Sequence, residues 1–189
     1  MSKAQGSRAD WRSALSKELM GTERLFVLGV GNPRKGDDAA GSVFARRLMR
    51  ELAPKKRSAP AGGSGSGRPG GKAGKLRPFE VQVLDAGESP ENATGRIREF
   101  RPTHVLIVDA ALGGLVPGTI FLIDKKKIAQ EDISTHRIPL VHLVRYLEES
   151  IDCRVTLAGI EPQEIAWGKP VSPAVKAAAA RLAAWLARL

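Results

Sequence analysis

The stretch from Leu25 to Gly41, LFVLGVGNPRKGDDAAG, constrains the fold of this chain more than any other part of it. Its first four residues are apolar and form the short run that a parallel strand buried on both faces needs. Turn-forming residues follow, among them Gly36, which is suited to a positive φ, and a helical pattern begins just beyond Asp37 and Asp38. The sequence therefore predicts a strand, a turn and a helix, with two acids at the carboxyl end of the strand.

Asp37 and Asp38 are candidates for chemistry because ligands of open α/β sheets bind at the carboxyl ends of the strands. Either acid could instead cap the following helix by accepting its first backbone N–H groups. The glycine turn alone is weak evidence, since it lacks the third glycine of a dinucleotide-binding fingerprint. It is not a phosphate-binding P-loop either, because Lys35 is not followed by Ser or Thr.

The rest of the chain alternates between strand and helix patterns. Further strands are predicted at 80–84, 104–108, 119–123 and 154–160, and helices at 89–100, 139–150 and 172–189. The connection from Ala110 to Gly118 is too short and too rich in Gly and Pro for a helical crossover, so we expect the strand after it to be antiparallel. The fold class predicted is a three-layer α/β/α sandwich around a mostly parallel five-stranded sheet with one antiparallel strand.

The chain has 189 residues, of which 42% are hydrophobic, and this is enough for one globular domain. We expect a single domain over 23–189, preceded by an N-terminal extension at 1–22 and interrupted by a flexible linker at 53–78. No apolar run approaches the roughly 18 residues of a membrane span, and the N-terminus lacks the pattern of a secretory signal. With one cysteine, an internal disulfide is excluded, so we expect a cytoplasmic protein without membrane insertion.

The net charge of +10 suggests a nucleic-acid partner at first sight, but most of the charge lies outside the expected core. Residues 53–78 contain seven basic residues, no acid, seven glycines and four prolines, and residues 1–22 add a further +2. The remainder is close to neutral, and the basic stretch has no interleaved aromatic residues for stacking on bases. We expect a solvated spacer there, with a polyanion-binding arm as the alternative, and no nucleic-acid partner.

Two further residues belong to the same predicted edge of the sheet. Asp85 follows the second predicted strand as Asp38 follows the first, and His136 lies in the loop ISTHRIPL before a helix. Two carboxylates and one imidazole suit a borderline divalent metal such as nickel, zinc or manganese, although no spacing rule supports such a site. His104 begins a buried strand and is expected to be structural, and Cys153 lies outside any recognisable thiol-protease signature.

His142 lies on the helix that follows His136. It could contact a metal-binding side chain without binding the metal itself, but a packing role is the simpler interpretation.

Four motifs together carry a resemblance to a known family: GVGNPRKGDDAAG, VLDAG, ISTHRIPL and GIEPQEIAWGKPVSPAV. The chain resembles the hydrogenase maturation endopeptidases over residues 25–52 and 79–189. This resemblance implies an enzyme that trims a C-terminal extension from the precursor of the large subunit of a nickel-iron hydrogenase after nickel insertion. It also implies that Asp38, Asp85 and His136 match the metal-contacting positions of the family. The chain departs from the family pattern at Ala39 and Ala40, where a glycine is common, and by its basic linker.

The resemblance further implies that nickel is presented by the substrate, and no organic cofactor is expected. Either the ion polarises the scissile carbonyl, or Asp38 or Asp85 acts as general base and the ion serves for recognition. Two alternatives stay open: a peptidyl-tRNA hydrolase, which shares the opening strand and turn but carries an early histidine that is missing here, and a non-catalytic nickel-dependent docking protein. We expect a monomer.

Overall fold

The computed structural model describes residues 10–54, 79–125 and 137–189. The strands are β1 (Arg24–Val30), β2 (Glu80–Gly87), β3 (His104–Ala110), β4 (Ile120–Ile123) and β5 (Arg154–Ile160). The helices are α1 (Trp11–Glu18), α2 (Ala40–Leu52), α3 (Thr94–Phe100), α5 (Arg137–Tyr146) and α6 (Pro173–Leu186). Short 3-10 turns, η1 (Gly36–Ala39) and η2 (Pro90–Ala93), precede α2 and α3, and a π-helical turn, η3 (Leu147–Ile151), follows α5.

The described strands form one five-stranded sheet in the order β2-β1-β3-β5-β4. Strand β1 pairs in parallel with β2 and β3, and β3 pairs in parallel with β5. Strand β4 is antiparallel to β5. This pairing confirms the antiparallel strand predicted from the sequence. The physical reason is that the short connection before β4 can reverse the chain but cannot carry it across a face of the sheet.

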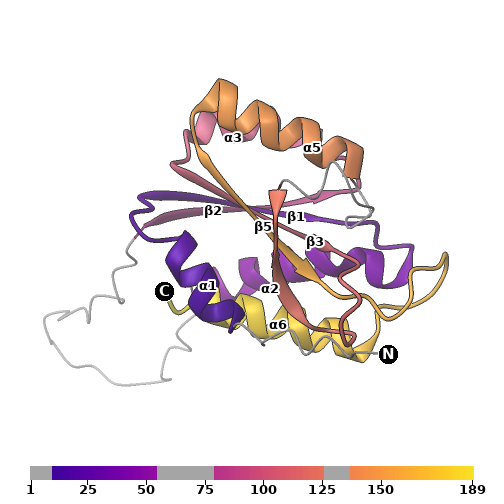
Figure 1. The fold of residues 1–189 in the computed structure, drawn as a ribbon. Coiled ribbons are helices and arrows are strands. Elements are labelled where there is room, and N and C mark those ends of the chain that lie inside the picture. Colours follow the sequence, from indigo (N-terminus) through magenta and orange to yellow (C-terminus); the bar gives the residue numbers. More distant parts are fainter. Residues whose placement is uncertain (1–9, 55–78, 126–136) are drawn as a thin grey trace, which may run out of the picture.

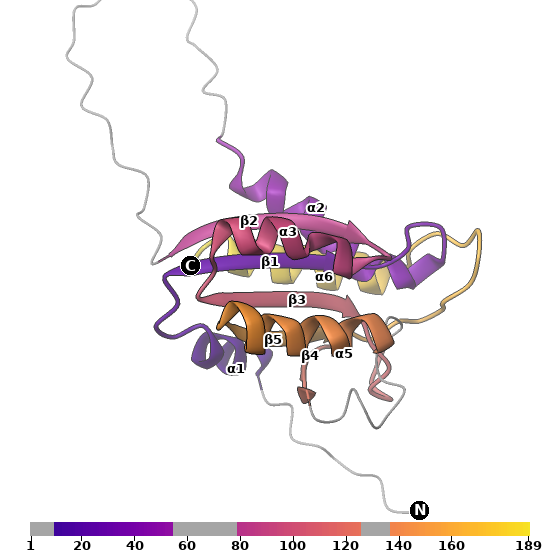
Figure 2. The same ribbon diagram turned by 90° about the horizontal axis from the view of Figure 1, so that it is seen from above.

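Helices cover both faces of the sheet (Figure 1). Helices α1, α2 and α6 lie on one face and α3 and α5 on the other, as the view from above also shows (Figure 2). Each face has its own cluster of buried apolar side chains. The three-layer α/β/α sandwich expected from the sequence is therefore confirmed.

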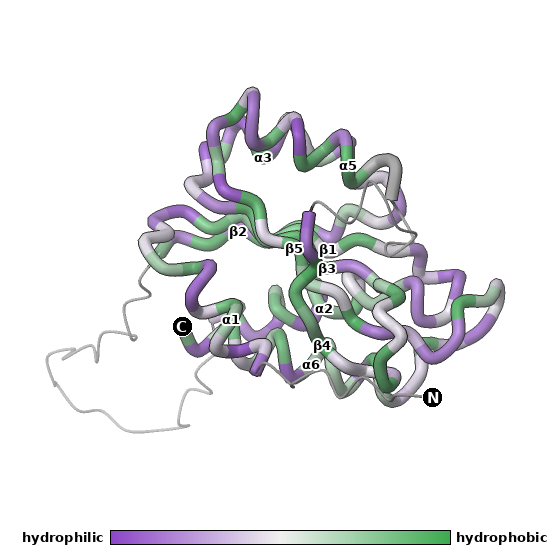
Figure 3. The backbone as a smooth tube through the Cα atoms, viewed as in Figure 1, coloured by the Kyte–Doolittle hydropathy of each residue, from purple (hydrophilic) through white to green (hydrophobic). Residues whose placement is uncertain are grey.

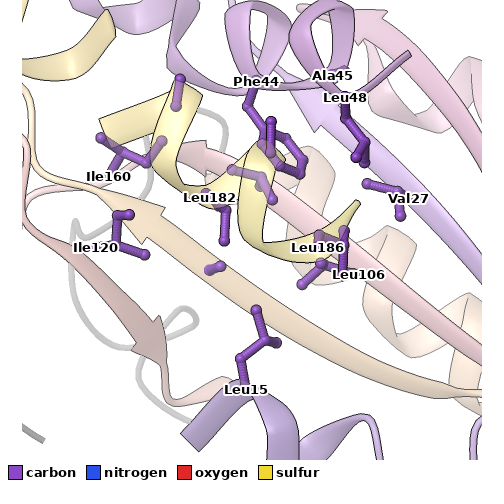
Figure 4. Close-up of a cluster of buried hydrophobic side chains, with 14 of the residues drawn as sticks. Leu15, Val27, Phe44, Ala45, Leu48, Leu106, Ile120, Ile160, Leu182 and Leu186 are labelled. Atoms are coloured by element: carbon purple, nitrogen blue, oxygen red, sulfur yellow. The ribbon is translucent and has the colours of Figure 1, made fainter. Parts of the chain in front are cut away.

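The alternation of side chains along the strands divides the core between the two faces. On β1, Val27 packs toward α2 and α6, whereas Phe26 and Leu28 pack toward α3 and α5. Leu182 of α6 belongs to the same buried cluster as Phe44 of α2 (Figure 4). The three central strands β1, β3 and β5 are buried on both faces, which explains why their apolar runs are continuous.

Helix α5 begins and ends earlier than the sequence pattern suggested. The helix expected over 139–150 runs from Arg137 to Tyr146 and continues into the π-helical turn to Ile151. The turn ends where Asp152 adopts a left-handed φ of 57°. Leu140, Leu143, Val144 and Leu147 are buried, as the helical spacing predicted, and the alternation of hydrophilic and hydrophobic positions is visible along α5 (Figure 3).

Three strands are longer than predicted, and the first is β1, which runs from Arg24 to Val30 and not only over the four apolar residues at 25–28. Strand β2 continues past Leu84 to Gly87, so Asp85 lies within the strand and not after it. The extension is stabilised by β1, since Val30 pairs with Gly87 across an irregularity and the N–H of Gly31 donates to the carbonyl of Gly87. Strand β3 likewise includes Asp109, which pairs with Gly159 of β5.

Part of the segment that we expected to be an N-terminal extension packs against the domain. Leu15 of α1 is fully buried in the cluster that contains α2 and α6 (Figure 4). The rings of Trp11 and Trp185 meet edge to face with centroids 5.3 Å apart. The guanidinium of Arg154 donates to the carbonyls of Glu18 and Met20, which fixes the end of α1 to β5.

Nearly all of the expected linker at 53–78 lies outside the described residues, which end at 54 and resume at 79. Within the described ranges, no helix combines the length and the apolar character that crossing a membrane requires.

Candidate active site

The turn after β1 folds back on itself and fixes the position of Asp38. Gly31 has a φ of 145°, and a Cβ atom there would lie 2.0 Å from the carbonyl oxygen of Asp38. Gly36 has a φ of 60°, as predicted. Only glycine tolerates so close a backbone approach, so these positions hold the acid pair next to the carboxyl end of β1.

Asp38 is 3% exposed, and its Oδ2 accepts a hydrogen bond of 3.0 Å from the backbone N–H of Asn32. The side-chain amide of Asn32 in turn donates to the carboxylate of Glu88 at 2.6 Å. Asn32 therefore connects the buried acid of the first turn to an exposed acid just beyond β2.

Asp85 lies on β2 and is held through both carboxylate oxygens. Its Oδ1 accepts from the hydroxyl of Ser42 at 2.7 Å and from the N–H of Gly87 at 3.2 Å. Its Oδ2 forms an ion pair with Nε of Arg46 at 2.6 Å. The Asp85 side chain is 16% exposed, so it remains accessible from solvent.

Asp38 contacts the turn after β1 directly, and Asp85 is linked to the same turn through Ser42. Asp38 accepts from the N–H of Asn32, while Ser42, which donates to Asp85, lies 3.1 Å from the carbonyl oxygen of Gly31. The structure thus places the two predicted carboxylates around Gly31 and Asn32, at the edge where parallel strands of the sheet end. His136, the third predicted member, lies outside the described residues.

Hard or borderline divalent cations prefer carboxylate oxygens and imidazole nitrogens, so Asp38 and Asp85 suit part of a metal's coordination sphere. Within the described residues, no three His, Cys, Asp or Glu side chains form a cluster that could hold a metal ion. Asp38 and Asp85 can therefore contribute two ligands, and a third would have to come from elsewhere.

Asp37 does not cap the helix that follows it, so that interpretation was wrong. No side-chain hydrogen bond caps η1 or α2. Asp37 is buried, and its carboxylate accepts from the backbone N–H groups of Gln163, Glu164 and Ser172 at 2.8, 3.2 and 2.6 Å. It therefore holds the segment between β5 and α6 against the turn after β1, and Figure 2 shows both segments at the same end of the sheet.

His104 is structural, as expected. Its ring is buried, with Nδ1 3.2 Å from the hydroxyl of Thr22 and Nε2 2.8 Å from that of Thr156. Burial, together with the positive charges of Arg154 and Lys125, lowers the pKa of His104 from 6.5 to about 4. The ring is therefore neutral near pH 7. His142, by contrast, is exposed on α5, so a packing role for it is excluded.

Cys153 is a poor nucleophile in this fold. Its thiol is buried and donates to the carbonyl of Leu147 at 3.5 Å. Burial, reinforced by the negative charges of Glu148 and Asp152, raises the pKa of Cys153 to about 11. Because the thiolate is the reactive form, the protonated thiol does not support a cysteine mechanism.

Sequence reasoning missed Asn32, Ser42, Arg46 and Glu88 as residues around the two carboxylates. A signal for two of them was present, because Asp38, Ser42 and Arg46 follow one another at intervals of four residues. This spacing places side chains on one face of a helix, and α2 turns that face toward Asp85. The role of Asn32 had no such signal, since its contact with Glu88 joins two separate loops.

Comparisons with known proteins agree on one family. The sequence profile of the hydrogenase maturation proteases matches residues 72–188. The chain is 36% identical over 164 residues to the hydrogenase 3 maturation protease of Escherichia coli K12, and the match covers 84% of this chain and 88% of the relative.

Solved structures show the same relationship. The crystal structure of the nickel-iron hydrogenase maturation protease HycI from Thermococcus kodakarensis KOD1 has a TM-score of 0.73 and 30% identity, covering 93% of this chain and 97% of that one. The solution structure of the endopeptidase HycI from Escherichia coli has a TM-score of 0.63 and 33% identity, covering 85% and 87%.

The five-stranded, mostly parallel sheet with helices on both faces is thus the fold of an α/β maturation protease. The chain belongs to the hydrogenase maturation protease family. This membership decides against the peptidyl-tRNA hydrolase alternative.

Proposed function

We propose that this protein removes a C-terminal extension from the nickel-loaded precursor of the large subunit of a nickel-iron hydrogenase. The observation that carries the proposal is the placement of Asp38 and Asp85 around the Gly31–Asn32 turn, at the edge where ligands of such sheets bind. Family membership supplies the reaction class, and the two carboxylates supply the groups that would meet the precursor.

Nickel enters this proposal as part of the substrate. An ion held by the precursor takes Asp38, Asp85 and His136 as further ligands, and the precursor without nickel offers nothing for these residues to hold. The protease then selects the metal-loaded precursor because both proteins bind the same nickel ion. A site of two carboxylates and one imidazole without thiolate ligands is expected to bind a free ion only weakly.

The fold supports this role by fixing the two carboxylates before the substrate arrives. Asp38 is held by a backbone N–H, and Asp85 is held by Ser42 from helix α2. Such fixed groups need little reorganisation when charge develops in the reaction. An oxygen of Asp38 or Asp85 that is not bonded to the ion can act in this proposal as general base toward a water molecule near the scissile bond.

The test is a mass measurement on the precursor after incubation with the purified protease. The protease is first treated with a chelator, which is then removed, and nickel-loaded and nickel-free precursors are compared. Loss of a C-terminal peptide only from the loaded precursor is the expected result. Equal cleavage of the nickel-free precursor would refute the role of nickel, and binding of the loaded precursor without any cleavage would favour the docking protein.

The setting of the reaction is also part of the proposal. We expect the protein to act in the cytoplasm, because a single cysteine gives it no internal disulfide to form in an oxidising compartment. We also expect it to act as a monomer with the precursor as its protein partner. Size-exclusion chromatography with light scattering, with and without precursor, tests the monomer.

A further inference from the structure

We propose that Arg46 is a positioning residue that occupies the outer oxygen of Asp85 and so keeps the empty protease from collecting divalent metal ions from solution. The ion pair yields to a nickel ion only when the precursor presents that ion. This inference rests on the proposed role of Asp85 as a ligand to the substrate's nickel, and it adds a residue that restricts when that ligand is available.

The two oxygens of Asp85 are held in different ways. Oδ1 faces the protein, where it accepts from the buried hydroxyl of Ser42 and from the N–H of Gly87. Oδ2 is paired with Arg46, whose side chain is 56% exposed. The inner oxygen is thus fixed by the fold, whereas the outer oxygen is covered by a long side chain that reaches over from α2.

The exposed position of Arg46 makes the ion pair easy to exchange. A pair with one strongly exposed partner is weak, because water solvates the guanidinium when it leaves and salt screens the attraction. A cation approaching Asp85 must nevertheless displace a positive charge already placed there. For a free ion with few other protein ligands, whose binding is weak, even this modest competition lowers the affinity by a measurable factor.

A nickel ion held by the precursor must also displace Arg46 from Asp85, but it does so more easily than a free ion. Most of its ligands travel with it, and the docked precursor holds the ion close to Asp85 at a high effective concentration. Arg46 can then turn into solvent, and the outer oxygen becomes available. Arg46 therefore discriminates between an ion from solution and an ion delivered by the substrate.

The neighbouring Arg47 offers a matched control. It lies on the same helix, is 45% exposed, and forms an ion pair of 2.7 Å with Glu51 instead of Asp85. Arg47→Gln removes the same charge from the same helix without uncovering the candidate site. Any effect of net charge alone should therefore be equal in Arg46→Gln and Arg47→Gln.

The experiment is calorimetric titration of Ni²⁺ into the chelator-treated full-length protease. We expect Arg46→Gln to bind Ni²⁺ about three- to fivefold more tightly than the unmodified protein, and Arg47→Gln to stay within about 1.5-fold. Arg46→Lys, which keeps the charge, should remain near the unmodified value. Adding Asp85→Asn to Arg46→Gln should abolish the gain, and circular dichroism melting checks that each variant is folded.

The inference is overturned if Arg46→Gln gains no more affinity than Arg47→Gln, if the gain survives in the double variant, or if no variant binds Ni²⁺ even at millimolar concentration. The proposed function is judged separately, by whether Asp85→Asn still cleaves nickel-loaded precursor. Loss of cleavage in Asp85→Asn together with unchanged Ni²⁺ binding in Arg46→Gln would reject the role of Arg46 alone.

Discussion

The carboxylate of Asp37 accepts a hydrogen bond of 2.6 Å from the backbone N–H of Ser172, the residue that caps helix α6. Two residues separated by 135 positions in the sequence thereby tie the turn after β1 to the start of the last helix. The same carboxylate also accepts from Gln163 and Glu164. Asp37 therefore acts on the fold, while its neighbour Asp38 belongs to the candidate site.

This division predicts that Asp37→Asn destabilises the protein. The amide has one acceptor oxygen in place of two and no charge, so the N–H groups of Gln163, Glu164 and Ser172 lose a charged acceptor that binds all three. We expect the free energy of unfolding in urea to fall by about 2–4 kcal/mol. Asp38→Asn is the control and should fall by less, because the N–H of Asn32 can still donate to the remaining amide oxygen. An equal loss in both variants would contradict the assignment.

Asp38→Asn, Asp85→Asn and His136→Ala should each reduce cleavage of the nickel-loaded precursor to below the detection limit of mass spectrometry. The two amides keep the shape of the carboxylates and remove the charge that would bind the ion. The variants should retain the circular dichroism spectrum of the unmodified protein. If folded Asp85→Asn cleaves at an undiminished rate, the site is placed wrongly.

The sequence predicted the layers of the fold and the strand at which each candidate carboxylate lies, because burial on both faces leaves continuous apolar runs that glycine turns interrupt. It did not predict that β2 continues through Asp85, since the extra pairing depends on Gly31 donating to Gly87 across the sheet. The partners of Asp37 were equally hidden, because local spacing carries no information about a hydrogen bond to residues 163–172.

His104 predicts a pH dependence of stability. The pKa of His104 is lowered from 6.5 to about 4 in the folded protein. Between these pH values its imidazole is mostly protonated in the unfolded chain and mostly neutral in the folded protein. The contribution of His104 to the free energy of unfolding is therefore complete above about pH 6.5 and decreases as the pH falls below that value. From about pH 7.5 to about pH 5 we expect a loss on the order of 2 kcal/mol from this residue.

The measurement is the difference in urea unfolding free energy between the unmodified protein and His104→Gln at several pH values. Glutamine does not titrate, so the pH-dependent part of this difference isolates the histidine. A difference that stays constant across the range would show that His104 is not held neutral by burial.

Cys153 should be dispensable for cleavage. Its pKa of about 11 keeps the thiol protonated at neutral pH, and the side chain is buried. We expect Cys153→Ala to cleave precursor at the unmodified rate with a loss of roughly 1 kcal/mol in stability. A thiol-reactive dye should label the folded protein far more slowly than the protein in urea. Complete loss of cleavage in a folded Cys153→Ala variant would restore the thiol mechanism.

Gly41 should tolerate no side chain. A Cβ atom there would lie 2.0 Å from the carbonyl oxygen of Val108 and 2.3 Å from that of Val30, so α2 would have to move off the sheet. We expect Gly41→Ala to lose more than about 3 kcal/mol of stability. A Cβ atom on Gly95 in α3 would meet no other atom within 4 Å, and Gly95→Ala should gain about 0.5–1 kcal/mol. Thermal melting of both variants distinguishes the two sites.

At Gly41 the backbone of α2 lies directly against the backbone of the sheet. Gly29 of β1 faces Gly41 from the sheet, and a Cβ atom on Gly29 would lie 2.2 Å from the carbonyl oxygen of Gly41. The distance between α2, which carries Ser42, and the ends of β1 and β3 is thus limited at this point by backbone atoms. Exchanges among aliphatic residues elsewhere in the core leave this backbone contact in place. The relative from Thermococcus kodakarensis, which is 30% identical to this chain, keeps the same fold with a TM-score of 0.73.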